Sequence, residues 1–305
     1  MPSNTGIDQP QPTVSFVSVI IPCFNDREVL DRCLQSLLAQ DYPPERYEII
    51  VVDNNSTDHS PDIVRRFERV NLLHESKQSA YASRNRGVRE AKGDIIAFTD
   101  SDCVIPRDWI ARIDRAMREP RVHLVLGHVQ PSGKTHAMHL LRAYERQKDS
   151  YVFNAPASEK FYGHAGNMAV RRNVFSILGP FAERERGVDS IFVQRVVRRF
   201  GRNSLRYEPQ LLAEHLEMQS ATRYFDKMYV YGRSRALGNS LLKIKPLSIA
   251  DRLRVFRRTV QNERLDLLET ILLLALLTIG AACWRAGSFS AKTKQMFPGT
   301  QHENT

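Results

Sequence analysis

The chain has 305 residues and carries 44 Lys plus Arg against 34 Asp plus Glu, a net charge of +10 with histidine neutral. With 42% hydrophobic and 26% charged residues, the composition is that of a globular protein and excludes a disordered or collagen-like chain. The start of the chain lacks a signal-peptide pattern, and no apolar run has the length of a secure membrane span. Four cysteines without a CxxC pair predict reduced thiols in the cytoplasm. The basic balance favours phosphate-bearing ligands, anionic lipid or nucleic acid.

The first part of the chain alternates apolar strands with amphipathic helices. Residues 1–13 are polar and proline-bearing, which predicts a loose tail. Nearly continuous apolar runs predict buried strands over residues 16–22 and 47–53. A short third strand over 70–74 and a fourth over 94–100 follow, with helices between the strands. This alternation predicts an α/β fold with a doubly wound, mostly parallel sheet.

The second part is less regular. Its patterns predict, in order, a strand over 121–130, a helix over 137–150, a polar loop over 158–172, a helix over 189–200 and an extended piece over 211–215. Beyond about residue 236 the sequence changes to basic helices and one apolar stretch. We therefore expect a main domain over residues 14–235 and a C-terminal helical region over 236–305.

Polar side chains gather where the predicted strands end. They are Asn25 and Asp26 after the first strand, residues 53–58 at the second, and residues 100–102 at the fourth. Doubly wound sheets bind ligands outside the carboxyl ends of their strands, so we expect a ligand there. The first strand runs into PCFND rather than GxGxxG, and GxxxxGK[ST] is absent from the sequence. These absences argue against a dinucleotide-binding site and a P-loop NTPase.

The DSD sequence at residues 100–102 is the sharpest local signal. In an extended segment, residues two apart point to the same side, so Asp100 and Asp102 can converge on one point. Two close carboxylates repel each other unless a cation or a shared proton compensates. Mg²⁺ or Mn²⁺, partly coordinated by a diphosphate, fits such an incomplete set of oxygen ligands. The alternative is a solvated turn, since DxD occurs often by chance.

Asp53 ends the second predicted strand, in VVDNNSTD. One interpretation is an Asx-type turn or a helix cap, which Ser56 and Asp58 could equally serve. The other is a carboxylate that accepts hydrogen bonds from a nucleobase edge or a ribose. Both can hold if the later residues cap the helix and Asp53 faces the ligand.

Three segments in order carry a resemblance: SVIIPCFND, EIIVVDNNSTD and SAYASRNRGVREAKGDIIAFTDSDCVIPRDWI. Together they resemble the nucleotide-binding half of a family 2 glycosyltransferase with a GT-A fold. The resemblance covers residues 16–118 strongly and continues to about residue 235. It implies a nucleotide-sugar-binding half over 14–118, an acceptor half over 119–235, and inverting, metal-dependent transfer of a sugar to a hydroxyl acceptor.

The resemblance also implies roles for residues of the first half. Asp53 matches an aspartate that contacts the base of the donor, and Asp100 matches the DxD residue nearer the ribose. Asp102 matches the more direct ligand of a divalent metal, Mg²⁺ or Mn²⁺. Pro22 and Asn25 fall where the family's first loop lines the nucleotide pocket.

Three further residues have both an implied role and an alternative. Arg84 matches a helix position that faces the diphosphate or the DxD, with a surface arginine as the alternative. Asp189 matches the catalytic base, but at a helix N-terminus it could cap free N–H groups, which lowers its pKa. Glu183 and Glu185 are nearby fallbacks for the base. His215 matches a histidine that completes the metal site, and the alternative is a structural histidine.

The C-terminal region combines a basic segment with an apolar one. Arg252, Arg254, Arg257 and Arg258 crowd one short stretch, and the apolar run 271–284 follows. The run is too short for a confident span and predicts an interfacial or re-entrant helix. Arginines beside such a helix suit an anionic leaflet, which predicts a cytoplasmic protein held peripherally on the inner face of the cell membrane. A helix packed on the catalytic domain or at a dimer interface is the alternative.

Two other classes of function compete with sugar transfer. A nucleotidyltransferase usually carries a glycine-rich basic loop after the first strand, and PCFND does not supply one. The net positive charge suggests a nucleic-acid-binding protein, but no recognised motif supports it, so we expect no nucleic acid partner. We expect a nucleotide-sugar donor and a saccharide or lipid-linked acceptor, in the synthesis of an envelope polysaccharide or glycolipid.

Overall fold

The computed structural model describes residues 14–155, 160–183, 187–238 and 245–296, so the tail predicted over 1–13 lies outside the described residues. Within these ranges, eight strands form a sheet in the order β3-β2-β1-β4-β7-β6-β8-β5. The strands are β1 Val17–Cys23, β2 Tyr47–Asp53, β3 Val70–His74, β4 Ile95–Thr99, β5 Cys103–Val104, β6 Leu124–Pro131, β7 Asn167–Arg171 and β8 Leu205–His215.

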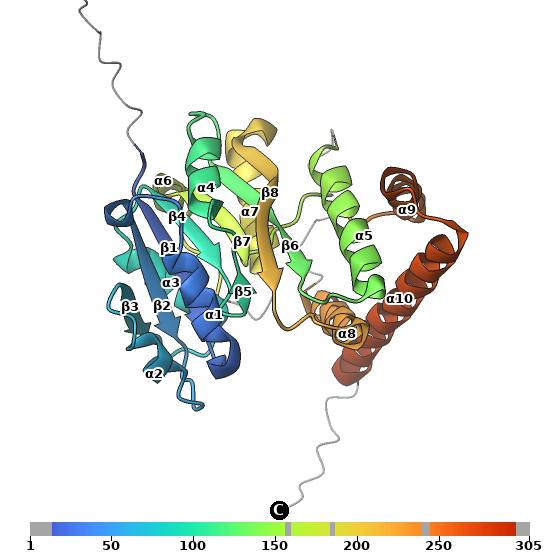
Figure 1. Cartoon of the computed structure of the whole chain (residues 1–305), viewed down its shortest axis with the longest axis horizontal. Helices are drawn as coiled ribbons and strands as arrows, with labels where there is room; N and C mark the ends of the chain where they lie inside the picture. Colours follow the sequence, from blue (N-terminus) through green and yellow to red (C-terminus); the bar gives the residue numbers. More distant parts are fainter. Residues whose placement is uncertain (1–13, 156–159, 184–186, 239–244, 297–305) are drawn as a thin grey trace, which may run out of the picture.

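Helices cover both faces of this sheet. The α-helices of the described residues are α1 Arg27–Leu38, α2 Ser60–Val64, α3 Ala80–Glu90, α4 Trp109–Met117, α5 His136–Phe153, α6 Arg172–Leu178, α7 Val188–Phe200, α8 Ala221–Gly238, α9 Ile249–Glu263 and α10 Leu267–Met296. Side chains of α1 and α4 share a core with one face of the sheet, and those of α3, α6 and α7 share a core with the other. Figure 1 shows α5, α8, α9 and α10 as a group beyond the β6 side of the sheet.

The first half of the sheet is parallel, as predicted. β1 pairs with β2 and β4, and β2 pairs with β3, all in parallel. All seven residues of β1 are buried, as a nearly continuous apolar run requires when helices cover both faces. The register sets Cys23 beside Asp53, and Asp53 beside His74. The ends of three strands therefore meet at one edge of the sheet.

The prediction of a loop over residues 158–172 was wrong for the last part of this range. Residues Asn167–Arg171 form β7, which runs antiparallel between β4 and β6 and makes the sheet mixed. The apolar part of this strand is only three residues long, which is too short for the sequence pattern to indicate a strand. Its pairing on both sides, rather than its own sequence, makes it a central strand.

The helices α8 and α10 approach each other closely at glycines. A Cβ added to Gly232 would lie 1.9 Å from the carbonyl oxygen of Trp284, and one added to Gly287 would lie 2.0 Å from that of Tyr229. Glycine at these two positions is what allows the two backbones to lie so close. The domain boundary at residue 235 stays a prediction, but α8 packs with the C-terminal helices.

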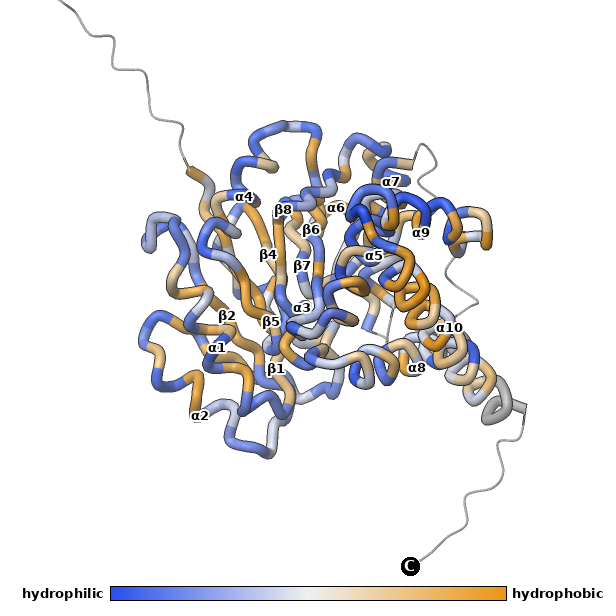
Figure 2. Tube along the Cα trace, turned by 45° about the vertical axis from the view of Figure 1, so that its right-hand side comes forward, coloured by the Kyte–Doolittle hydropathy of each residue, from blue (hydrophilic) through white to orange (hydrophobic). Residues whose placement is uncertain are grey.

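The helix α10 extends well beyond the apolar run 271–284. Its stretch Leu267–Ala291 has 25 residues, and the mean hydropathy of its most apolar window is 2.1, which by length and composition is enough to cross a membrane. The helix is longer than the apolar run because Glu269 and Arg285 lie within it and do not end it. Figure 2 shows the hydrophobic colouring of α10, and only 17% of its most apolar window is buried in the structure.

Candidate donor and metal site

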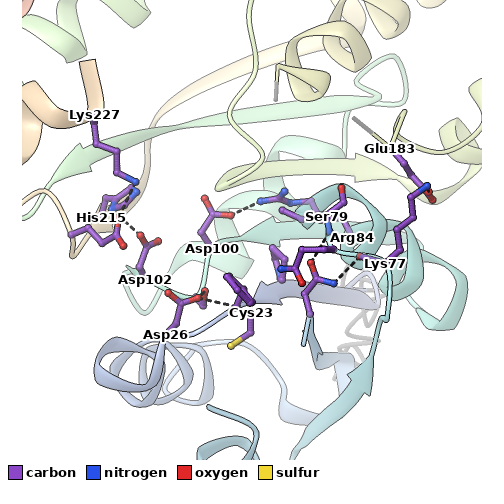
Figure 3. A pocket seen from close by; sticks show the side chains of 17 residues that line it. Cys23, Asp26, Lys77, Ser79, Arg84, Asp100, Asp102, Glu183, His215 and Lys227 are labelled. Carbon is purple, nitrogen blue, oxygen red and sulfur yellow. Dashed lines mark hydrogen bonds and ion pairs between the residues drawn. The ribbon is translucent and has the colours of Figure 1, made fainter. Parts of the chain in front are cut away.

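A pocket of about 720 Å³ opens at the carboxyl ends of β1 and β4 (Figure 3). Its walls come from the end of β1, the loop before α1, the N-terminal part of α3, the DSD motif and the segment from β8 to α8. Five carboxylates and three basic side chains line it, namely Asp26, Asp100, Asp102, Glu183 and Glu217, with Lys77, Arg84 and Lys227. The excess of negative charge favours the binding of a cation together with an anionic ligand.

The DSD motif forms the floor of the pocket between β4 and β5. Ser101 and Asp102 are buried, so the motif is not a solvated turn. The hydroxyl of Ser101 donates a hydrogen bond to Asp26, whose carboxylate also accepts one from the backbone N–H of Phe24 at 3.2 Å. Asp26 is the N-cap residue of α1, but its side chain forms no capping hydrogen bond. Asp26 instead holds the first loop against the motif.

His215 completes a candidate metal site with Asp102. Because β8 runs antiparallel to β5, His215 is paired with Cys103, the residue next to Asp102. Its Nδ1 atom lies 3.1 Å from Asp102 Oδ2, yet this buried nitrogen has no hydrogen-bond partner among the described residues. One ligand atom each of Asp102, His215 and Glu217 lie within 4.8 Å of one another. A divalent cation among these three would satisfy the orphaned nitrogen.

The electrostatics of this pair suit metal binding. Burial, reinforced by the negative charge of Asp100, raises the pKa of Asp102 to about 8. Burial lowers the pKa of His215 to about 4, so the imidazole is neutral at physiological pH and keeps a lone pair for a ligand bond. A carboxylate in need of a positive partner and a neutral imidazole form a donor set that Mn²⁺ and Mg²⁺ can use.

Arg84 reaches the pocket from α3 and is buried, at 6% exposure, so the alternative of a surface arginine was wrong. Its guanidinium forms an ion pair with Asp100 and lies 5.3 Å from the ring centroid of Tyr81. Its Nε atom is buried with no hydrogen-bond partner in the part of the chain that the structure describes. Ser79 caps α3 by accepting from the N–H groups of Tyr81 and Ala82. The helix start is therefore fixed beside the pocket.

The residues predicted to bind the nucleoside differ in their placement. Pro22 lines the pocket. Asp53 is buried just behind the wall, where its carboxylate accepts from the N–H of Ser56 at 3.3 Å. Asn25 has a φ of 56°, and its side chain accepts from the N–H of Thr57 at 2.8 Å rather than lining the pocket. The geometry thus gives Asn25 a supporting place between two loops, and all three roles stay predictions.

Asp189 lies at the start of α7, beside the loop that leads into β7. One of its carboxylate oxygens accepts from the N–H of Ser190 at 2.8 Å, and the other faces the N–H of Ala165 at 3.3 Å. The next residue, Gly166, is so close to the DSD motif that a Cβ there would lie 2.5 Å from Asp100 Oδ2. Asp189 and Asp100 therefore each lie against residues 165–166, but Asp189 is not among the residues that line the pocket.

The two fallback bases are less suited. Glu183 lines the pocket, but its carboxylate accepts hydrogen bonds from Lys77 at 2.5 Å and Asn85 at 3.4 Å. The bond from Lys77 lowers the pKa of Glu183 and makes it a weaker base. Glu185 lies outside the described residues.

Among the charged residues of the pocket, the sequence analysis missed Lys77, Glu217 and Lys227. Glu217 stands two residues after His215, so the same spacing rule that joined the DSD aspartates could have found it. Lys227 comes from α8, and its Nζ lies 2.8 Å from Glu217 Oε2. No local signal marks Lys227, because its place depends on how α8 packs.

Comparison with known proteins identifies the family. A model of glycosyl transferase family 2 matches residues 18–179. Glycosyltransferase AglE of Haloferax volcanii is 35% identical over 180 residues, which is 55% of this chain and 57% of AglE. The chain spans about half the length of the relatives it matches.

Solved structures are similar over most of the chain. Mannosyltransferase PcManGT from Pyrobaculum calidifontis, in complex with GDP-Man and Mn²⁺, has a TM-score of 0.60 at 20% identity and covers 94% of this chain and 89% of its own. Residues 1–349 of S. aureus TarS with UDP-GlcNAc have a TM-score of 0.51 at 16% identity, with 94% and 93% covered. These likenesses confirm the GT-A type of fold. Since the family match also covers more than half of the sequence, the chain belongs to glycosyl transferase family 2.

Proposed function

We propose that this chain is an inverting glycosyltransferase that moves a sugar from a nucleotide-diphosphate donor to a hydroxyl acceptor. The observation that carries the proposal is the meeting of Asp102, His215 and Glu217 in a pocket at the carboxyl ends of the parallel strands. The GDP-Man, Mn²⁺ and UDP-GlcNAc named for the two similar structures support it. Because those two donors differ in base and sugar, we propose only the class of donor.

In this proposal Asp102 and His215 hold a Mg²⁺ or Mn²⁺ ion, with Glu217 in reach. Bound there, the ion would neutralise charge on the departing diphosphate. Asp189 accepts the proton of the acceptor hydroxyl as that oxygen bonds to the anomeric carbon. The bond from the anomeric carbon to the diphosphate breaks on the opposite side, which inverts the configuration. Arg84, whose Nε is unsatisfied, offers a further donor to the diphosphate.

The nucleoside end of the donor would lie toward β2. Pro22 and Asp100 line the pocket and would contact the donor directly. Asp53 is not a lining residue of the pocket, but its neighbour Asn54 is, and from this position Asp53 would contact the base. Asn25 would act through the loop that it holds.

The decisive experiment is a panel of nucleotide-sugars tested for binding and slow hydrolysis, with Mn²⁺ and with EDTA. We expect one or a few donors to bind and to release nucleoside diphosphate only when metal is present. Failure of every donor to bind in Mn²⁺ would overturn the proposal. Formation of a nucleotide-sugar from a nucleoside triphosphate and a sugar phosphate, with release of pyrophosphate, would favour the nucleotidyltransferase alternative.

We also propose that the C-terminal helices rest on an anionic membrane surface and so favour a lipid-linked acceptor. One face of α10 is buried against α8 and α5, with Leu273 at 0% and Leu276 at 7% exposure. The opposite face is apolar and open, with Leu268, Ile271 and Leu274 at 77%, 56% and 53%. A helix with one face held on the protein lies along a bilayer surface more readily than it spans the bilayer.

The helix α9 adds positive charge beside apolar side chains. Ile249 and Leu253 are 77% and 54% exposed and stand one turn apart. Arg252 and Arg257 are exposed on either side of this stripe by helical spacing. Apolar side chains flanked by arginines complement the headgroups of an anionic leaflet.

Sedimentation with lipid vesicles tests this surface. We expect the native chain to bind phosphatidylcholine vesicles more strongly when they contain phosphatidylglycerol, and salt to weaken the binding. The double change Ile271→Glu and Leu274→Glu should abolish it. Ile177→Glu is the matched control, because Ile177 is 49% exposed on α6, away from these helices. Equal vesicle binding by all three proteins would refute the membrane surface.

A further inference from the structure

Lys227 is a cation at the metal end of the pocket that the proposed reaction does not yet use. Figure 3 shows it extending from α8 toward His215 and Asp102, while Lys77 and Glu183 lie at the opposite end. Its Nζ lies 2.8 Å from Glu217 Oε2, and its side chain keeps 28% of its exposure, against 50% for Glu217. The ammonium group is therefore close to the candidate metal ligands and still accessible from the pocket.

The other two cations of the pocket are also paired with carboxylates. Arg84 is paired with Asp100 and is nearly fully buried, so among its guanidinium atoms the unsatisfied Nε is the one offered to the diphosphate. Lys77 is paired with Glu183 at 2.5 Å. Lys227 has only the half-exposed Glu217 as an ion-pair partner among the described residues, and such an exposed pair is weakly held. Of the three, Lys227 alone is paired with a member of the candidate metal set of Asp102, His215 and Glu217.

The helix that carries Lys227 is fixed from two sides. One turn before it, buried Tyr224 donates a hydrogen bond from its hydroxyl to Glu145 of α5 at 2.8 Å. Five residues after it, Gly232 packs against the backbone of α10 at Trp284. The position of the ammonium group thus depends on α5 and α10, and α8 lies outside the family match, which ends at residue 179.

We propose that Lys227 binds the diphosphate of the donor, so that the paired helices α8 and α10 form part of the donor site. This inference rests on the proposed function. A diphosphate carries more negative charge than the single carboxylate of Glu217, so it attracts the ammonium group more strongly. When the diphosphate binds with its metal ion, the ammonium group beside the metal is placed to bind one of its oxygens. Lys227 then leaves Glu217, which becomes available to the metal.

The test measures binding of UDP, GDP, ADP, CDP and dTDP by titration calorimetry in saturating Mn²⁺, with the matching monophosphates alongside. For the diphosphate that the native chain prefers, we expect Lys227→Met to weaken binding at least tenfold and Lys227→Arg to retain it within about threefold. Monophosphate binding should change less than twofold, and binding of Mn²⁺ alone should hold or tighten, because a nearby positive charge is gone. Lys134→Met, at an exposed position outside the pocket, is the control.

The outcomes separate the two proposals. Native-like diphosphate binding by Lys227→Met, or equal losses for monophosphate and diphosphate, would overturn the role of Lys227 and leave the proposed function standing. A native chain that binds none of the diphosphates in Mn²⁺ would overturn the proposed function, and this inference with it. A loss confined to diphosphates, with thermal unfolding unchanged, supports the inference.

Discussion

The parallel half of the sheet and the C-terminal helices deliver side chains to the same pocket by different means. Asp100 and Asp102 stand at the end of β4, and the parallel register with β1 fixes where that end lies. Lys227 arrives on α8, whose position is fixed only by its packing on α5 and α10. The first arrangement follows from chain topology, and the second follows from contacts between distant segments. Damage to packing should therefore affect the second set of residues far more than the first.

Asp102→Asn should have the largest effect, because it removes a charged oxygen ligand without changing the strand end that carries it. We expect loss of Mn²⁺-dependent donor binding and a fall in transfer by about 10³-fold or more. Donor titration with and without Mn²⁺ measures it. Asp41→Asn is the control, since Asp41 is exposed and paired with Arg107 away from the pocket. Undiminished binding would remove Asp102 from the metal site.

Asp189→Asn should separate chemistry from binding. The amide keeps the shape and can still face Ala165, but it cannot accept a proton, so transfer should fall by about 10² to 10⁴-fold with donor affinity unchanged. Single-turnover kinetics and donor titration check the two halves of this expectation. Native turnover would assign the base elsewhere, and Glu183→Gln then tests the next carboxylate.

The pH dependence of metal binding follows from the raised pKa of Asp102. Because burial raises that pKa to about 8, the carboxyl group is protonated at lower pH and must release its proton when a metal binds. We expect Mn²⁺ affinity to rise roughly tenfold per pH unit between pH 6 and 7.5, and to level off above about pH 8. Calorimetry at several pH values measures it. A flat profile would mean that Asp102 is ionised before the metal arrives.

The sequence predicted the parallel half closely and the rest in part. The strands at 47–53 and 70–74 have the predicted bounds. For β2 the reason is that a buried parallel strand needs a continuous apolar run that ends in polar residues, whereas β3 is an edge strand with only Val70 buried. The strand β7 was missed because a central position between two partners can stabilise five residues with little pattern of their own. Lys227 was missed for a related reason, since a lysine on a helix reads as solvated until the partners of that helix are known.

Glycine substitutions in α10 test whether the packing of α8 on α10 fixes the position of Lys227. A Cβ on Gly287 would meet the backbone of Tyr229, whereas one on Gly280 would have its nearest neighbours at 3.8 Å. Gly287→Ala should therefore cost about 1 to 3 kcal/mol of stability, and Gly280→Ala should be neutral or slightly stabilising. If α10 positions Lys227, Gly287→Ala should also weaken diphosphate binding in Mn²⁺. Binding of Mn²⁺ alone, through residues of β4 and β8, should remain.

The smallest effect is expected for the contacts that attach α9, and their contribution to stability depends on pH. Asp251 closes a capping box with Ser248 and accepts hydrogen bonds from Lys160 at 2.7 Å and Tyr151 at 2.5 Å. The bond from Lys160 lowers the pKa of Asp251. Its stabilisation is therefore fully present above the unfolded pKa of about 4 and is lost as pH falls through the depressed folded pKa. Asp251→Asn should destabilise the protein by about 1 kcal/mol at pH 7, with a smaller difference near pH 3. Denaturant unfolding at both values tests it, and an equal difference at both would show that the charge of Asp251 contributes nothing.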